Sequence, residues 1–128
     1  MNVVALAGGT GGAKLAAGLQ EIVGGGLTVI ANAGDDVEAL GVHVSPDPDL
    51  CTYWLSGETD EERGWGIRDD GFTVFERLTK LGAPDWFGLS DRDLALQNVR
   101  YVMNAAGSLH EDFRPSPDGF IAERARQV

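Results

Sequence analysis

The stretch that decides the fold is Gly8-Gly9-Thr10-Gly11-Gly12-Ala13-Lys14, which follows an apolar run at residues 2–7. Beyond it, apolar residues recur every three or four positions, and this spacing predicts a helix over residues 13–23. A second apolar run follows at residues 27–31. A strand, a glycine loop (residues 8–12), a helix and a strand in this order predict a parallel β-α-β unit.

Further elements follow from local signals. Residues 41–45 are expected to be extended, and Asp49 is expected to cap a helix that runs to about Ser56. Helical spacing of apolar residues predicts two more helices, over 72–81 and over 91–106.

These elements together predict an α/β protein with a Rossmann-like, three-layer parallel sheet. Only two convincing parallel strands are present, and a doubly wound sheet usually has more, so the fold is expected to be incomplete in this chain. Residues 1–106 are expected to form a nucleotide-binding α/β domain, followed by a divergent C-terminal tail at 107–128.

Composition restricts the class of protein. Twenty acidic and 10 basic residues give a formal net charge of −10, which argues against broad contact with nucleic acid. No segment approaches the roughly 18 consecutive apolar residues of a membrane span, and the apolar start lacks a basic region, so neither membrane insertion nor a signal peptide is expected. A single cysteine, Cys51, fits a reducing compartment and predicts a cytoplasmic protein.

The glycine loop is a candidate phosphate site. Glycines let backbone N–H groups approach phosphate oxygens, the following helix offers its positive N-terminus, and Lys14 adds a cation. The candidate nucleotide-binding residues are therefore Gly8, Gly9, Thr10, Gly11, Gly12 and Lys14. The alternative is a tight turn that only packs a strand against a helix.

Two acidic loops, Gly34-Asp35-Asp36 and Asp47-Pro48-Asp49, follow extended segments. Ligands of open α/β sheets bind beyond the carboxyl ends of the strands, so the first loop is expected beside the glycine loop. Carboxylates near a polyphosphate suit Mg²⁺. Asx turns or helix caps are the alternative for both loops.

Other polar residues are ambiguous on sequence alone. The amide of Asn32 either orders the glycine loop or meets a ligand, and Trp65 either covers a shallow core or offers a flat surface to a ring. Arg63 and Arg92 are either phosphate clamps or structural ion pairs. Three further residues are expected to be non-catalytic: His43, His110 and Cys51.

Five motifs in order resemble those of the 2-phospho-L-lactate transferase family, over about residues 3–95. They are the stretch 8–14, Asn32-Ala33-Gly34-Asp35-Asp36, the stretch 44–49, Glu62-Arg63-Gly64-Trp65-Gly66 and the stretch 85–95. The resemblance implies a Rossmann-like, usually dimeric enzyme. It also implies transfer of a 2-phospholactyl or phosphoenolpyruvyl group from a GDP-activated donor to the deazaflavin alcohol Fo, with release of GMP and assistance from Mg²⁺, in coenzyme F420 biosynthesis.

The resemblance also implies roles for individual residues. The glycine loop would hold the diphosphate of the donor, Asp35 and Asp49 would be the metal ligands, and Asp36 would stand near the acceptor hydroxyl. Asn32, Arg63 and Trp65 are the candidate substrate-binding residues.

The resemblance has limits. Leu96-Gln97 stand where the family usually has Thr-His, and family members are more than twice as long. One alternative is a nucleotide- or sugar-binding regulatory protein of the related gluconeogenesis-factor group, which shares the glycine loop. The motifs at 45–49 and 62–66 favour the transferase. Another alternative is a truncated, non-catalytic remnant.

Overall fold

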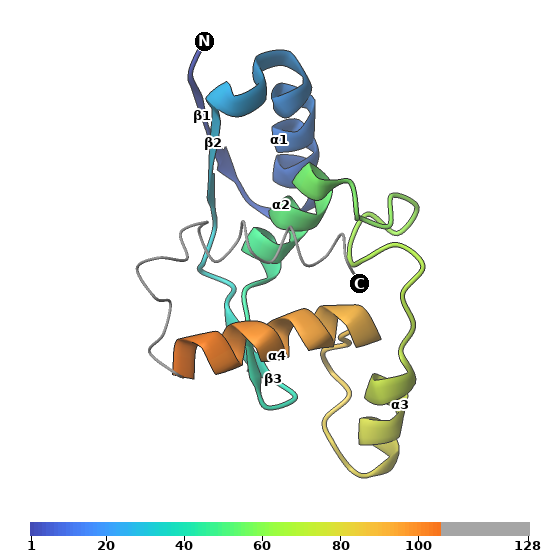
Figure 1. Ribbon diagram of the computed structural model, residues 1–128. Coiled ribbons are helices and arrows are strands. Elements are labelled where there is room, and N and C mark those ends of the chain that lie inside the picture. Colours follow the sequence, from blue (N-terminus) through green and yellow to red (C-terminus); the bar gives the residue numbers. More distant parts are fainter. Residues whose placement is uncertain (106–128) are drawn as a thin grey trace.

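A computed structural model describes the backbone of residues 1–105 and the side chains of residues 1–100; His110 and the predicted tail at 107–128 lie outside this range. The elements in chain order are β1 (Val3–Ala7), α1 (Gly9–Val23), the 3₁₀ turn η1 (Gly24–Gly26), β2 (Leu27–Ala31), β3 (Val37–Ala39), β4 (Val42–Val44), α2 (Pro46–Ser56), α3 (Thr73–Lys80) and α4 (Asp91–Ala105). Figure 1 shows β1, β2 and α1 at one end, α3 and α4 at the other, and α2 packed against α1.

The predicted β-α-β unit is confirmed. β1 and β2 pair in parallel, with Val3 opposite Leu27 and Ala7 opposite Ala31, and α1 connects them. Parallel pairing places the carboxyl ends of both strands at one edge, next to the start of α1. The protein is thus an α/β protein with a partial Rossmann-like fold.

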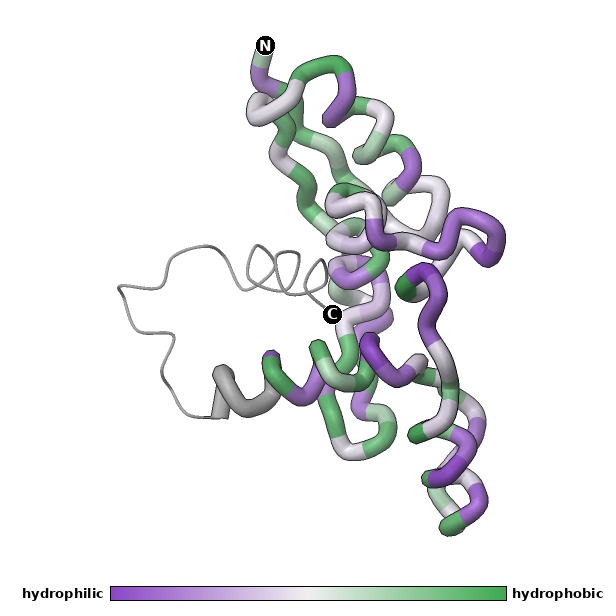
Figure 2. Tube along the Cα trace, turned by 45° about the vertical axis from the view of Figure 1, so that its right-hand side comes forward, coloured by the Kyte–Doolittle hydropathy of each residue, from purple (hydrophilic) through white to green (hydrophobic). Residues whose placement is uncertain are grey.

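The parallel sheet is covered on one face within the described residues. Ala5 and Ala7 are buried, whereas Val4, Leu6 and Ile30 are 65%, 79% and 54% exposed. Side chains alternate between the faces of a strand, so the three exposed residues share the face opposite α1. Figure 2 shows these strands as largely hydrophobic. A three-layer sheet needs a cover on both faces, so the fold is incomplete in the described part of the chain.

The first helix is longer than expected. α1 begins at Gly9, so the prediction of a start at residue 13 is wrong, and the glycine loop forms the first turn of the helix. Glycines disfavour a helix interior, which hides this start from periodicity. Tertiary packing explains one of them, because a Cβ on Gly12 would lie 2.9 Å from the Cα of Ala7. Gly12 therefore lets α1 approach β1 closely.

The extended segment predicted at 41–45 is one strand of a hairpin. β3 and β4 pair antiparallel, with Val37 opposite Val44. Leu40 and Gly41 connect the strands, both with positive φ (52° and 81°), as type I′ hairpin turns require. β3 went unpredicted because three residues are too few for a periodic signal.

The later helices are close to prediction, with one correction. α2 begins at Pro46 with Ser45 in the N-cap position, so Asp49 lies inside the helix and does not cap it. Proline is favoured in the first helical turn, where its missing N–H costs nothing. α3 and α4 occupy nearly the predicted ranges. A core of Ala39, Val42, Val44, Leu89 and Leu94 joins the hairpin to α4.

Candidate functional site

The start of α1 is bonded to a carboxylate from α2. The backbone N–H of Gly9 donates a 2.8 Å hydrogen bond to Oδ1 of Asp47, which is 8% exposed. A Cβ on Gly8 would lie 3.3 Å from the other oxygen of Asp47. The first N–H groups of a helix have no intrahelical partner and carry positive partial charge, so a carboxylate is stabilised at this position.

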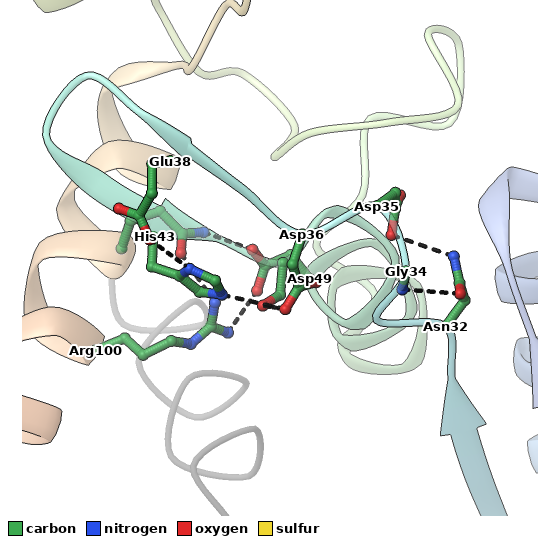
Figure 3. Close-up of polar contacts among 10 residues, drawn as sticks. Asn32, Gly34, Asp35, Asp36, Glu38, His43, Asp49 and Arg100 are labelled. Atoms are coloured by element: carbon green, nitrogen blue, oxygen red, sulfur yellow. Dashed lines mark hydrogen bonds and ion pairs between the residues drawn. The ribbon is translucent and has the colours of Figure 1, made fainter.

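Asn32 connects this carboxylate to the loop that follows β2. Its side-chain nitrogen donates to Oδ2 of Asp47 at 3.1 Å and to Oδ1 of Asp35 at 3.2 Å. Its side-chain oxygen accepts from the N–H of Gly34 at 3.0 Å, as Figure 3 shows. The Asn32 side chain thus orders the acidic loop directly and reaches the glycine loop through Asp47, and Asp35 and Asp47 flank one amide.

Asp36 belongs to a second polar cluster on the β3–β4 hairpin. Its Oδ2 accepts from Ser45 Oγ at 3.0 Å and lies 3.1 Å from Nε2 of His43. Nδ1 of His43 lies 2.7 Å from a carboxylate oxygen of Glu38. These hydrogen bonds raise the pKa of His43 above its ordinary value, with the bond to Glu38 contributing most. Asp36 is therefore fixed by partners on β4 and just beyond it.

Asp49 faces α4 and not the glycine loop. Gln97 Nε2 donates to Oδ2 of Asp49 at 2.6 Å, and Arg100 pairs with Oδ1 (Figure 3). Gln97 also donates to Asp93, which accepts from the hydroxyl of Tyr53 at 2.8 Å. Burial raises the pKa values of Asp49, Asp93 and Tyr53. Both oxygens of Asp49 are engaged in a buried network between α2 and α4.

The aromatic segment after α2 stacks on Arg63. The guanidinium lies 4.9 Å from the ring centre of Trp65 and 5.6 Å from that of Phe72. Arg63 also pairs with Asp60 at 2.9 Å and donates to the carbonyl of Ile67. Trp65 remains 47% exposed. Arg63 therefore supports the ring of Trp65.

Trp65 lines a small pocket. Its volume is about 130 Å³, and Phe87 contributes a second aromatic wall. Asp47, Asp49 and Asp93 supply its acidic side. Apolar walls with a few polar groups are typical of sites for small ring-bearing ligands.

The remaining predicted residues, Thr10, Lys14 and Arg92, each contact a different segment of the chain. Thr10 Oγ1 donates to the carbonyl of Gly64 at 3.3 Å, which ties the glycine loop to the motif at 62–66. The ammonium of Lys14 lies 5.4 Å from the ring centre of Trp54 on α2. Arg92 pairs with Asp70 in an ion pair of 3.6 Å.

The structure brings together the glycine loop, Asn32 and Asp35, as the strand order predicts, and places Asp36 and Asp49 in separate networks. Sequence reasoning missed Asp47 as a site residue, although it stands in a quoted acidic motif. Pro46 is the signal that identifies it, since proline at the start of α2 puts Asp47 in the first helical turn.

The fold and the site together define an α/β protein of Rossmann-like type. Its glycine loop follows the first strand, and polar residues gather at the carboxyl ends of its parallel strands. The chain belongs to the 2-phospho-L-lactate transferase family, whose family model matches residues 3–115.

Curated relatives agree with this family. A phosphoenolpyruvate transferase of Thermobifida fusca is 45% identical over 117 residues, covering 84% of this chain and 36% of that protein. Proteins of the same name from Streptomyces avermitilis and Mycolicibacterium smegmatis are 47% and 43% identical, again over 84% of this chain. The chain spans about a third of the length of these relatives.

Proposed function

We propose that this chain carries the N-terminal part of a transferase that moves a 2-phospholactyl or phosphoenolpyruvyl group from a GDP-activated donor to the alcohol Fo, releasing GMP. Family membership and the relatives' name, phosphoenolpyruvate transferase, support the reaction class. The observation that carries the proposal is the glycine loop at the end of β1, with Asn32, Asp35 and Asp47 beside it.

The diphosphate of the donor would lie against the first turn of α1. The N–H groups of that turn supply positive charge there, and the ammonium of Lys14 would add to it by leaving the ring of Trp54. The carboxylate of Asp47 already bonds to Gly9 at this turn and would repel a diphosphate. A divalent cation held by Asp47 would remove this repulsion.

Two carboxylates fit such a cation. Asp35 and Asp47 flank the amide of Asn32, and each retains lone pairs beyond the bonds described. Mg²⁺ typically takes one or two carboxylates and completes its shell with phosphate oxygens and water. Within the described residues, no three His, Cys, Asp or Glu side chains converge as a metal site. Asp49 would join only by giving up its bonds to Gln97 and Arg100.

The chemistry suits this residue set. Attack of an alcohol on a phosphoryl centre requires alignment and charge neutralisation more than a covalent contribution from the protein. Bound Mg²⁺ would neutralise charge on the phosphates. Asp36 would orient the acceptor hydroxyl or take its proton, and Trp65, supported by Arg63, would offer a face to a ring of a substrate.

Calorimetric titration with GDP tests the binding half of the proposal. This chain is expected to bind GDP weakly, and more tightly with Mg²⁺ than without. Asp47→Asn and Asp35→Asn are each expected to weaken the Mg²⁺-dependent affinity by at least about fivefold, or about 1 kcal/mol. Lys14→Ala should weaken binding with or without the metal. Asp85→Asn removes the same charge from an exposed loop and serves as the control. Equal affinity in both site variants and the control would remove Asp35 and Asp47 from the site.

Turnover tests the reaction itself. Fo, the GDP-activated donor and Mg²⁺ are incubated with the protein, and the phospholactyl product is separated by chromatography. We expect product with a protein that contains this chain together with the remaining two thirds of its relatives' length. Absence of product from such a protein, if well folded, would contradict the transferase assignment. The proposal includes a homodimer, as the family resemblance implies, and a cytoplasmic location, which the single cysteine predicts; sedimentation measures the oligomer.

Residues 1–105 contain no helix long and apolar enough to cross a membrane.

A further inference from the structure

His43 lies between two carboxylates at the edge of the candidate site. On β4, its Nδ1 is 2.7 Å from Oε1 of Glu38 on β3, and its Nε2 is 3.1 Å from Oδ2 of Asp36 (Figure 3). The imidazole is 48% exposed, Glu38 is 74% exposed and Asp36 is 24% exposed. The ring thus joins a carboxylate in solvent to a carboxylate that is mostly covered.

The two contacts favour the protonated form of the ring. An ionised carboxylate has only acceptor sites, and a neutral imidazole carries one N–H. With both carboxylates ionised, both short contacts are hydrogen bonds when both ring nitrogens carry protons, so the geometry favours the imidazolium. The helix α4 packs against β4 and contributes the cation of Arg100, which is paired with Asp49. Glu38 and Asp36 are the groups whose hydrogen bonds and charges favour the protonated ring.

The same contacts orient Asp36. Its Oδ2 accepts from both His43 and Ser45, whereas its Oδ1 is shielded from solvent and has no donor among the described residues. A buried oxygen without a donor destabilises the folded state. The two bonds through Oδ2 offset this cost and fix the plane of the carboxylate.

We propose that His43, held by Glu38, is a positioning residue that fixes the orientation of the Asp36 carboxylate through Oδ2. Glu38, His43 and Asp36 act as one unit, in which protonation of His43 governs the orientation of Asp36. The link of Asp36 to a substrate hydroxyl rests on the proposed function. The coupling of Glu38, His43 and Asp36 rests on their hydrogen bonds and is independent of the proposed function.

An NMR titration of the histidine rings tests the coupling in this chain. The chain has two histidines, and a His110→Gln variant assigns the resonances. His43 is expected to titrate above the ordinary value of 6.5. Glu38→Gln and Asp36→Asn should each lower its midpoint by at least about half a unit, and Asp85→Asn should leave it unchanged. A midpoint at or below 6.5, or one that neither variant moves, would overturn the proposal.

The pH dependence of turnover tests the positioning role. Deprotonation of His43 removes the donor to Asp36, so kcat is expected to fall as pH rises through the midpoint measured by NMR. The glutamine of His43→Gln keeps a hydrogen-bond donor but does not titrate, so this variant should abolish the fall of kcat at high pH. Its KM for the GDP-activated substrate should stay within about twofold of the unmodified protein. His43→Ala should lower kcat at every pH.

The outcomes separate the two proposals. If kcat of His43→Gln still falls as pH rises through the same midpoint, the positioning role is refuted. Absence of turnover in the unmodified protein would refute the proposed function, and the NMR titration would still decide the coupling of His43 to Asp36.

Discussion

Gly12 and Gly11 are neighbours in the first turn of α1, and the structure predicts opposite effects for the same substitution. A Cβ on Gly12 would lie 2.9 Å from the Cα and 3.1 Å from the carbonyl carbon of Ala7, whereas a Cβ on Gly11 has no atom within 4 Å. The Ala7 atoms in contact include the backbone of β1, so they cannot turn aside as a flexible side chain would. Gly12→Ala therefore pushes α1 away from the sheet.

The magnitudes follow from two opposing terms. Replacing glycine by alanine in an exposed helix contributes about 0.5–1 kcal/mol, and Gly11→Ala is expected to show this gain undiminished. Overpacking against a backbone costs about 1–3 kcal/mol, and Gly12→Ala carries both terms. The free energy of unfolding of Gly12→Ala is thus expected to lie about 1–3 kcal/mol below that of Gly11→Ala.

Urea unfolding followed by circular dichroism measures this difference. Both variants remove one glycine from the same helical turn, so effects on the unfolded chain largely cancel in the comparison. The slope m should agree between them, which would show that the same surface is exposed on unfolding. Equal midpoints, or a higher midpoint for Gly12→Ala, would refute the close approach of α1 to β1.

Two further predictions concern buried polar groups. Tyr53→Phe removes the 2.8 Å hydrogen bond to Asp93 and should lower the free energy of unfolding by about 1–2 kcal/mol in urea, because it leaves a buried carboxylate with one donor fewer; an unchanged midpoint would contradict the network. Cys51 is buried, and burial together with nearby Asp47 raises the pKa of its thiol. Iodoacetamide should therefore alkylate it at least about tenfold more slowly in the folded chain than in urea, and equal rates would show that α2 does not cover it.

The β-α-β unit is predictable from sequence because its signals are local. Two apolar runs, a helical period and the glycine stretch 8–12 each lie within a few residues, and parallel pairing follows from chain connectivity. The start of α1 at Gly9 is not predictable from sequence because its signal is not local. Glycines oppose a helix locally, and Gly12 is favoured there only by its contact with Ala7.

The sequence by itself determined the class of fold, the family and the edge of the sheet at which polar residues gather. Only the tertiary structure decided which residue each aspartate bonds to. Asp47 and Asp49 stand two residues apart on α2, yet one bonds to Gly9 and the other to Gln97, 48 positions along the chain. Neighbouring positions on a helix point in different directions, so their partners depend on where the helix begins and on what packs against each side. No periodicity encodes such distant pairings, which is also why His43 looked solitary in sequence and is held by two carboxylates in the fold.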